Sequence, residues 1–290
     1  MESKLGPLIV IVGATASGKS ELAMEIARQF DGEIIAADSW TVYEGFDIGT
    51  AKPSPEEQQR IPHHLLNVTT PDKGFSAVVF KKMASDAIKD IQLRGKLPII
   101  VGGAGLYIDS VIFDYSFLPQ HNAPDRAELN ALSIEELLNI VNLEGFDTTD
   151  IDTNNKRRII RLIENRGEKP SKGTLRTNTL IIGMLVDKAT LLERISSRLD
   201  KMISSGLEEE VKSLQDKYGW EIEPMKGIGY KEWRDYFNKT TTLQQTKDNI
   251  ISSSKKLVKK QETWFKRNKS IHWVENQSQA VALVTTFLGK

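Results

Sequence analysis

The stretch "LIVIVGATASGKS", residues 8–20, decides the fold of this chain. It opens with a continuous apolar run, as expected for a strand that is buried on both faces of a parallel sheet. The glycine-rich loop that follows fits the pattern G-x-x-x-x-G-K-[ST] from Gly13 to Ser20. Apolar residues then recur at helical spacing from Leu22 to Phe30. A strand, a loop and a helix in this order predict a P-loop that binds phosphate.

Each part of this loop suits an anion. The glycines let the main chain curl so that successive N–H groups point inward, and the following helix adds the partial positive charge of its N-terminus. Lys19 adds a full charge, and the Ser20 hydroxyl can bind Mg²⁺. The predicted diphosphate- or nucleotide-binding set is Gly13, Ala14, Thr15, Ala16, Ser17, Gly18, Lys19 and Ser20. The motif does not say which phosphate compound is bound.

Three further apolar runs have the length of strands: Ile34–Ala37, Leu97–Val101 and Leu180–Val186. Helical patterns lie between them, for example a helix that Ser76 can cap and that Gly95 can end. Alternating strands and helices predict an α/β fold, in which a P-loop NTPase-like parallel sheet is flanked by helices.

Residues 119 to about 175 break this alternation, because they are polar, carry two amphipathic helical patches and offer no strand. We expect residues 1–118 and 176–290 to form the α/β core with a mostly helical C-terminal part, and 119–175 to form a helical insertion. The last long helix places one stripe on one face: Ile250, Ser254, Leu257, Gln261 and Trp264.

Composition narrows the class of protein. Of 290 residues, 39% are hydrophobic and 27% are charged, which is typical of a soluble globular chain. The absence of cysteine excludes disulfides and thiolate metal sites. The N-terminal apolar run is too short for a signal peptide or a membrane span, so we expect a cytoplasmic protein without membrane contact. No feature indicates an obligate dimer, and a monomer is expected.

The charges balance at 39 basic and 39 acidic residues, but two basic runs are concentrated locally. They are "KRRIIR" at 156–161 and "KKLVKKQETWFKRNK" at 255–269, the second interleaved with Trp264 and Phe265. Either run alone is compatible with a solvated helix face, whereas two together indicate a nucleic-acid surface. We expect Trp264 and Phe265 to pack in the core rather than to stack on bases.

Asp38 ends the apolar run "GEIIAADS", and an acid at the carboxyl end of a parallel strand faces the ligand crevice. From its position alone, Asp38 can hold a metal, act as a general base, or cap a helix together with Ser39. The adjacent His63 and His64 are not expected to bind a metal, because neighbours in sequence rarely point at one ion.

The motifs together resemble the tRNA dimethylallyltransferase family, whose members prenylate adenosine next to the anticodon. The similar stretches run in family order from residue 8 to about 273. They are "GATASGKS", "ADSWTVYEGFDIGTAKPS", "IPHHLLNV", "GFSAVVF", "GKLPIIVGGAGLYI", "NNKRRIIRLIE", "GLEEEVKSL", "KGIGYKEW" and "KKQETWFKR". Many families share a P-loop, but "DIGTAKP" followed by "PHHL", and "GIGYKE" before "QETWF", are far more specific.

This resemblance implies that the P-loop holds the diphosphate of dimethylallyl diphosphate, with Mg²⁺ on Ser20, and that a carbon–oxygen bond breaks. It also implies that Lys19 neutralises the leaving group. Asp38 would first position the N6 amine of adenosine 37 and then remove its proton. Ala104 stands at the third catalytic position, where the family usually has threonine.

The acceptor implied by the resemblance is the anticodon stem-loop of tRNA, gripped by the 119–175 insertion, with its adenine extruded from the stack. The implied tRNA contacts are Asp38, Ser39, Trp40, Thr41, Arg126, Arg157, Arg158, Ile159, Ile160 and Arg161, with further backbone contacts from Lys255, Lys259 and Lys260. On this view "KRRIIR" is a nucleic-acid surface, and His63 and His64 belong to a structural and substrate-channel segment.

The chain departs from the family pattern at several positions. Ala104 lacks a hydroxyl that is thought to position the reacting amine, a loss of about 1 kcal/mol if one hydrogen bond is missing. Thr41 and Glu44 stand where glutamine and arginine are common, and Lys255 occupies an arginine position. The insertion is also shorter than usual. The residues Gly18, Lys19, Ser20 and Asp38 are unchanged.

Three other functions remain open at this point. The first is isopentenyl transfer to free AMP or ADP, as in cytokinin synthesis, which needs neither the helical insertion nor the basic C-terminal part. The second is a P-loop small-molecule kinase, which requires ATP. The third is a tRNA-binding relative without catalysis, which the alanine at position 104 keeps open.

Overall fold

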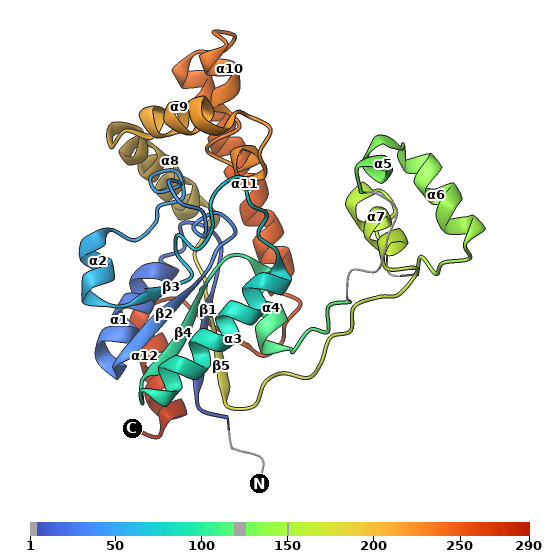
Figure 1. The fold of residues 1–290 in the computed structure, drawn as a ribbon. Coiled ribbons are helices and arrows are strands. Elements are labelled where there is room, and N and C mark those ends of the chain that lie inside the picture. Colours follow the sequence, from blue (N-terminus) through green and yellow to red (C-terminus); the bar gives the residue numbers. More distant parts are fainter. Residues whose placement is uncertain (1–4, 119–125, 150) are drawn as a thin grey trace. The chain divides into compact units, whose positions relative to one another are not determined.

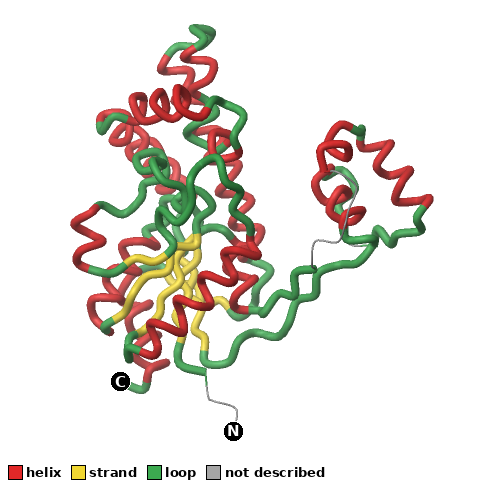
Figure 2. Tube along the Cα trace, viewed as in Figure 1, coloured by secondary structure: helices red, strands yellow, loops and turns green. Residues whose placement is uncertain are grey.

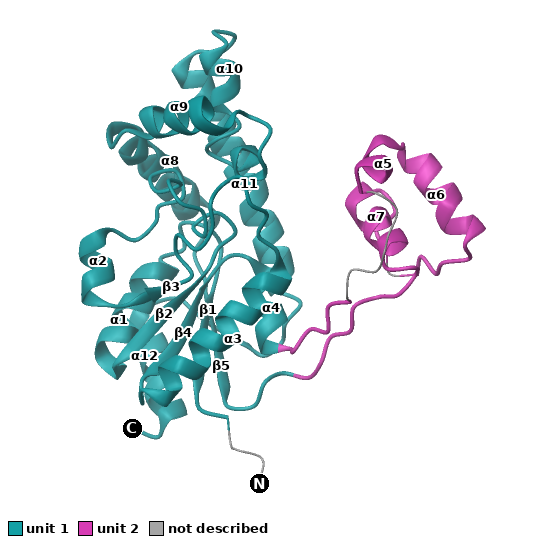
Figure 3. Cartoon of the chain, viewed as in Figure 1, with its two compact units in different colours: residues 1–112, 175–290 teal, residues 113–174 magenta. Residues whose placement is uncertain are grey.

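The computed structural model describes residues 5–118, 126–149 and 151–290. The chain divides into two compact units, one made of Met1–Ile112 with Leu175–Lys290 and the other of Phe113–Thr174 (Figure 3). The sequence analysis places the insertion at 119–175, whereas the second compact unit begins earlier, at Phe113, and ends at Thr174. The start of that insertion, 119–125, lies outside the described residues.

A single six-stranded sheet organises the first unit, and every pair of neighbouring strands is parallel (Figures 1 and 2). The strand order is β3-β2-β4-β1-β5-β6. The bounds are β1 Leu8–Val12, β2 Gly32–Ala37, β3 His63–His64, β4 Leu97–Gly102, β5 Thr179–Met184 and β6 Ile271–Val274. The α/β class and the four expected strands are confirmed, whereas β3 and β6 were not expected.

Helices cover both faces of the sheet (Figure 1). On one face, α1 and α12 pack with β1, β4, β5 and β6 around a fully apolar core. On the other face, α3 packs on β2 and β4, and α4 packs beside it. The bounds are α1 Lys19–Phe30, α2 Pro55–Arg60, α3 Ala77–Leu93, α4 Gly105–Ile112 and α12 Gln277–Leu288. The Ser76 hydroxyl caps α3 as expected, by accepting a hydrogen bond from the N–H of Val79.

A second group of helices lies beyond the carboxyl edge of the sheet (Figure 1). It comprises α8 Lys188–Ser204, α9 Leu207–Tyr218, the short 3₁₀ helix η1 Glu223–Lys226, α10 Trp233–Phe237 and α11 Leu243–Phe265. The expected break between α8 and α9 is at Gly206, whose φ of 98° favours glycine. These helices share an apolar core with the segment around Val42, Tyr43 and Phe46, which follows β2. That segment is thereby held over the carboxyl edge.

The second unit has a small core of its own, built from α5 Arg126–Ala131, α6 Ile134–Leu143 and α7 Lys156–Glu164. Leu137 and Val141 of α6 pack against Ile159, Ile160 and neighbouring apolar residues of α7. The Ser133 hydroxyl caps α6, and Glu136 completes a capping box. In the described part of the chain, no helix is both long and apolar enough to cross a membrane.

Candidate active site

The parallel topology brings three loops together at the carboxyl edge of the sheet. The P-loop follows β1, Asp38 follows β2, and the turn at 102–105 follows β4, which lies between those two strands. The contact is close: a Cβ atom on Gly102 would lie 1.9 Å from the carbonyl oxygen of Ala37. The N–H of Ala104 donates a hydrogen bond to that same oxygen at 3.2 Å. Only glycine at 102 permits this approach.

The P-loop adopts a curled main chain, with positive φ at Ala16 and Gly18. The Nζ of Lys19 donates to the carbonyl oxygen of Ala14 at 3.1 Å, which folds the lysine back over the loop. The Ser17 side chain is buried, and its Oγ has no hydrogen-bond partner among the described residues. A buried hydroxyl without a partner is costly unless a ligand supplies one, so the loop fits an anion.

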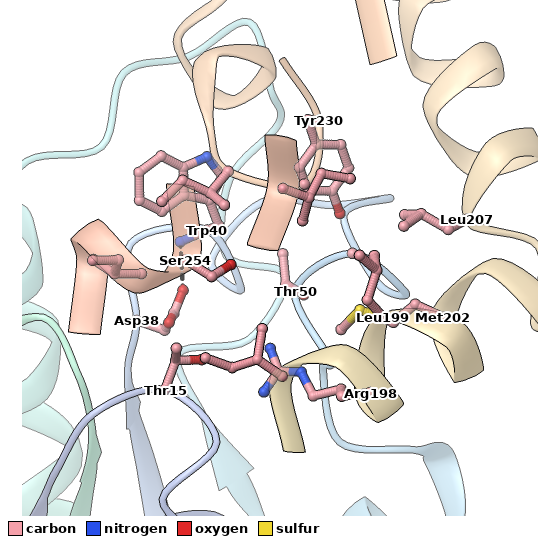
Figure 4. A pocket seen from close by; sticks show the side chains of 16 residues that line it. Thr15, Asp38, Trp40, Thr50, Arg198, Leu199, Met202, Leu207, Tyr230 and Ser254 are labelled. Atoms are coloured by element: carbon pink, nitrogen blue, oxygen red, sulfur yellow. Dashed lines mark hydrogen bonds between the residues drawn. The ribbon is translucent and has the colours of Figure 1, made fainter. Parts of the chain in front are cut away.

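Two cavities of about 170 Å³ each meet above these loops. The first, the apolar cavity, has Thr15, Asp38 and Arg198 at one end, as Figure 4 shows. Its remaining wall is mainly apolar, with Leu199, Met202 and Leu207 among its side chains. The second, the P-loop cavity, shares the polar residues Thr15, Asp38, Thr50 and Arg198, and adds Lys19 and Ser20. The charged residues thus lie where the P-loop cavity meets the apolar cavity.

The protein environment disfavours the charged forms of two cations in this site, Lys19 and Arg198. The pKa of Lys19 is lowered to about 8, chiefly by burial and also by the charge of Arg198, while Asp38 opposes the shift. Burial also lowers the pKa of Arg198, again opposed by Asp38. Within the described residues, neither cation forms an ion pair with a carboxylate. The site therefore gains from an added negative charge.

Asp38 is oriented by its own main chain. Its Oδ1 accepts hydrogen bonds from the N–H groups of Trp40 at 2.8 Å and Thr41 at 3.3 Å, which form an Asx turn. Its Oδ2 accepts none from the described residues and remains for a ligand. No helix starts near Asp38, since the next one, α2, begins at Pro55. The helix-cap interpretation is therefore wrong, and the metal and general-base roles remain.

One carboxylate fixes the rim of the apolar cavity. Glu210 of α9 accepts hydrogen bonds from the N–H groups of Ile48 at 2.7 Å and Gly49 at 3.0 Å, and from the hydroxyl of Tyr230 at 2.8 Å. A Cβ on Gly49 would lie 2.6 Å from the Tyr230 ring, so this position requires glycine. The motifs "DIGTAKP", "GLEEEV" and "GIGYKE" thus meet at one point, although they are far apart in sequence.

Residues near Asp38 support the site through hydrogen bonds. The Trp40 indole N–H donates to the carbonyl oxygen of Pro224 at 2.9 Å, which fixes the ring against η1. Thr41 is buried, and its Oγ1 has no partner in the described part of the chain. The pKa of Tyr107 of α4 is raised to about 12, chiefly by burial, and the nearby Ser39 opposes this shift. Ala104 lies just before α4, where its carbonyl oxygen accepts from the N–H of Ile108.

The residues of α7 that are expected to contact tRNA differ in the solvent exposure of their side chains. Ile159 and Ile160 are buried in the core of the second unit, so their side chains cannot contact RNA, and that part of the expectation is corrected. Helical spacing explains this, because the apolar pair faces α6 while the arginines around it point outward. Arg157 and Arg158 are exposed on α7. The buried Glu164 accepts from Arg126 at 2.9 Å and from Arg161 at 3.3 Å.

The long helix α11 has two different faces. Its exposed face carries the lysines at 255, 256, 259 and 260. Its other face includes buried Ile250 and Ser254, and Phe265 is 2% exposed. Trp264 is half-buried, donates its indole N–H to Asp109 at 3.2 Å, and has Arg267 stacked on its ring. Phe265 therefore packs in the core as expected, and Trp264 packs at its edge.

The sequence reading missed Arg198 and Thr50 as cavity residues, and did not foresee what Gln261 contacts. A signal for Arg198 was present. It lies three residues after Ile195 and one before Leu199, so a cation falls on the apolar stripe of α8. A charged residue on a buried stripe points to a ligand site.

Comparisons with known proteins agree with this geometry. A family model described as IPP transferase matches residues 41–268. A tRNA dimethylallyltransferase of Staphylococcus epidermidis is 38% identical over 305 residues, which cover 98% of this chain and 92% of that protein. The chain belongs to the IPP transferase family, the tRNA dimethylallyltransferases. The family expected from the motifs is confirmed, and with it the class of enzyme, a prenyltransferase that modifies tRNA.

Solved structures of this family share the fold. The tRNA isopentenylpyrophosphate transferase of Bacillus halodurans is 32% identical with a TM-score of 0.76, and the match covers 98% of this chain and 95% of that one. A eukaryotic dimethylallyltransferase acting on tRNA has a TM-score of 0.86 at 24% identity, covering 98% of this chain and 80% of that chain. At that identity, the second similarity concerns the fold alone.

Proposed function

We propose that this chain transfers the dimethylallyl group of dimethylallyl diphosphate to N6 of adenosine 37 in tRNA and releases diphosphate. The main support for this proposal is the group of charged side chains where the apolar cavity and the P-loop cavity share lining residues. Two half-buried cations and an oriented carboxylate lie there, beside the apolar part of the cavity wall. A diphosphate on a short hydrocarbon chain matches this division, with the anion on Lys19 and Arg198 and the hydrocarbon against Leu199 and Met202.

The leaving diphosphate is stabilised by groups that are already in place. The free N–H groups at the N-terminus of α1, together with Lys19 and Arg198, offset the negative charge that develops as the carbon–oxygen bond breaks. Because burial disfavours the charged forms of both cations, bound diphosphate relieves an existing cost. The apolar wall excludes water, which would otherwise capture the allylic carbon.

Magnesium fits the oxygen donors of the P-loop cavity. The Ser20 hydroxyl lines it, and Mg²⁺ commonly takes one or two protein oxygens together with phosphate oxygens. Among the residues that the structure describes, no three His, Cys, Asp or Glu side chains are grouped to hold a metal by themselves. When bound at Ser20, Mg²⁺ supplies further neutralisation of the diphosphate.

Asp38 is assigned as the general base that accepts a proton from N6 of the adenosine. The amine N6 attacks the allylic carbon as the carbon–oxygen bond breaks, and the two electrons of that bond leave with diphosphate. The new carbon–nitrogen bond makes the N6 protons acidic, and the Asp38 carboxylate accepts one of them. Its Oδ1 is held by the Asx turn, so Oδ2 is the atom that we assign to this step.

Binding of the anticodon stem-loop is proposed to use both units. Arg157, Arg158 and Arg161 of α7, with Arg126, would contact backbone phosphates, and the exposed lysines of α11 would add contacts from the first unit. The adenine must leave its stack to reach Asp38. We further propose that the protein acts as a monomer in the cytoplasm, where unmodified tRNA is present.

The experiment that tests this proposal supplies Mg²⁺, labelled dimethylallyl diphosphate and one acceptor at a time. The acceptors are a tRNA transcript with adenosine 37, the same transcript with guanosine 37, and AMP. We expect label only in the first, without ATP. Label in AMP would indicate the mononucleotide reaction, a requirement for ATP would indicate a kinase, and tRNA binding without transfer would indicate a binding protein.

A further inference from the structure

The side chain of Gln261 joins two of the loops that form the site. Its Oε1 accepts a hydrogen bond from the main-chain N–H of Thr15 in the P-loop, at 2.9 Å. Its Nε2 donates to the carbonyl oxygen of Gly103, in the turn after β4, at 3.2 Å. The amide therefore uses one acceptor and one donor at once, across sequence separations of 246 and 158 residues.

The turn after β4 is shaped to receive this helix. A Cβ on Gly103 would lie 2.1 Å from the Gln261 Nε2, and a Cβ on Gly105 would lie 2.3 Å from the Trp264 ring. Both glycines thus permit α11 to approach the turn that carries Ala104. The motif "GGAGLY" thus packs directly against the motif "QETW", in which Gln261 and Trp264 lie one helical turn apart.

These contacts place Gln261 between the loop assigned to the diphosphate and the turn next to Asp38. Thr15 lines both cavities and belongs to the loop that we assign to the diphosphate. Gly103 lies next to Ala104, whose N–H is bonded to Ala37, directly before Asp38. Glutamine can satisfy both groups, whereas an apolar residue would leave the Thr15 N–H and the Gly103 carbonyl without these partners.

We propose that Gln261 is a positioning residue, which fixes the P-loop at Thr15 against the turn after β4 and so sets the geometry of donor and acceptor. The proposal rests on the proposed function of the same site. Gln261 does not touch the reacting atoms, and it acts through the two main-chain groups it bonds. A displacement of about 1 Å of a reacting group can cost on the order of 100-fold in rate, so small shifts of the loop matter.

The test compares Gln261→Met and Gln261→Glu with the wild type. Methionine keeps the length and bulk but loses both hydrogen bonds, so KM for dimethylallyl diphosphate should rise about tenfold and kcat should fall, with KM for tRNA unchanged. Glutamate keeps the shape but places an oxygen against the Gly103 carbonyl and a negative charge beside the bound diphosphate. We expect a larger loss of donor affinity for Gln261→Glu than for Gln261→Met.

A residue that only fills space predicts the reverse order, because glutamate has the shape of glutamine and would retain wild-type kinetics. The matched control is Thr263→Ala, an exposed position on the same helix, which should change neither KM. Thermal melting of each variant checks folding. Wild-type donor KM in a folded Gln261→Met, or a loss confined to tRNA affinity, would overturn the proposal.

Calorimetric titration with inorganic diphosphate and Mg²⁺ separates this proposal from the proposed function. If Gln261 positions the P-loop, diphosphate should bind about tenfold more weakly to Gln261→Met than to Thr263→Ala, even if the wild type transferred no prenyl group. Equal binding to these two variants would exclude the positioning role independently of the reaction.

Discussion

One carboxylate lies at the amino end of strand β2 and another directly follows its carboxyl end, and within the described residues only the first is paired with cations. At its amino end, Glu33 is 2% exposed and is paired with Arg94, which donates to it through Nη2 at 2.8 Å, and with His64 at 2.8 Å. Hydrogen bonds from Arg94, the largest cause, and from His64 hold the pKa of Glu33 at about 2. At the carboxyl end, Asp38 lies near Lys19 and Arg198 without an ion pair in the described part of the chain.

This difference separates a structural cluster from a functional one. The charged forms of Glu33 and Arg94 stabilise each other, so this cluster needs no further partner. Around Asp38 the pKa values of both cations are lowered, so their charged forms are disfavoured until an anion arrives. Changes at the first cluster should alter stability, and changes at the second should alter the reaction.

The largest expected effect is at Asp38. Asp38→Ala removes the group that accepts the N6 proton, so kcat should fall by roughly 10³-fold, while diphosphate affinity changes little. Single-turnover transfer to tRNA measures the rate, and calorimetry with inorganic diphosphate measures the binding. Asp38→Asn is the matched control, because it keeps the shape and the Asx turn but not the basicity. If Asp38→Asn retained wild-type turnover, the base would be another group.

The second effect concerns Lys19. Lys19→Met should raise KM for dimethylallyl diphosphate by about 100-fold, since it removes a full charge from a partly dehydrated site. In the wild type, kcat/KM for the donor should fall as pH rises through about 8, because Lys19 of the free enzyme then loses its proton. A pH profile with no change in slope near pH 8 would contradict this assignment.

The charge of Lys19 should lower the stability of the fold although it strengthens donor binding. The folded-state pKa of about 8 is below the ordinary 10.5, so the charge of Lys19 opposes folding at pH below 8. This penalty fades as pH rises from about 8 to 10.5. Lys19→Met should therefore melt no lower than the wild type at pH 7, even though it binds donor poorly.

The opposite result is expected at the other end of β2. Glu33→Gln leaves Arg94 and His64 without their buried carboxylate, which should cost about 2 kcal/mol of unfolding free energy, since Arg94 is partly exposed to water. Kinetic constants should stay within a factor of two of the wild type. Chemical denaturation and the transfer assay, run on one preparation, check both statements.

The same cluster predicts a pH dependence of stability. Because the pKa of Glu33 is lowered from 4.5 to about 2, its contribution is fully present above pH 4.5 and is lost as pH falls towards 2. Glu33→Gln should flatten this part of the stability curve. An unchanged acid dependence in that variant would show that other carboxylates dominate the loss of stability.

The sequence predicted the elements whose signals are local. The P-loop, the four long strands and the capped helix α3 follow from short patterns, and Asp38 follows from its place at the end of a strand. The strand β3 is only two residues long, too short to have a periodicity. Strand β6 is interrupted by an exposed His272 and a half-buried Trp273, so it lacks a continuous apolar run. Such strands are specified by their neighbours in space.

Pairings across long separations could not be predicted from the sequence. Nothing near Glu33 in the chain indicates Arg94 as its partner, and nothing near Thr15 indicates Gln261. The helical stripe of α11 placed Gln261 on the inner face, but its hydrogen bonds depend on where the turn after β4 lies. Residues 159 and 160 were assigned to tRNA contact by their motif, whereas the burial of their side chains follows from the packing of α6 on α7.

The smallest expected effect comes from Ala104, which lies one residue beyond the groups held by Gln261. Ala104→Thr restores the hydroxyl usual in the family, and a hydrogen bond worth about 1 kcal/mol in the transition state corresponds to a rise in kcat of about fivefold. The donor KM should not change, because the main-chain bond from residue 104 to Ala37 is independent of the side chain. Ala104→Val is the control, since valine has the shape of threonine without the hydroxyl. Equal kcat values for these two variants would show that shape alone matters at this position, and that Asp38 positions the amine without a second hydrogen-bonding group.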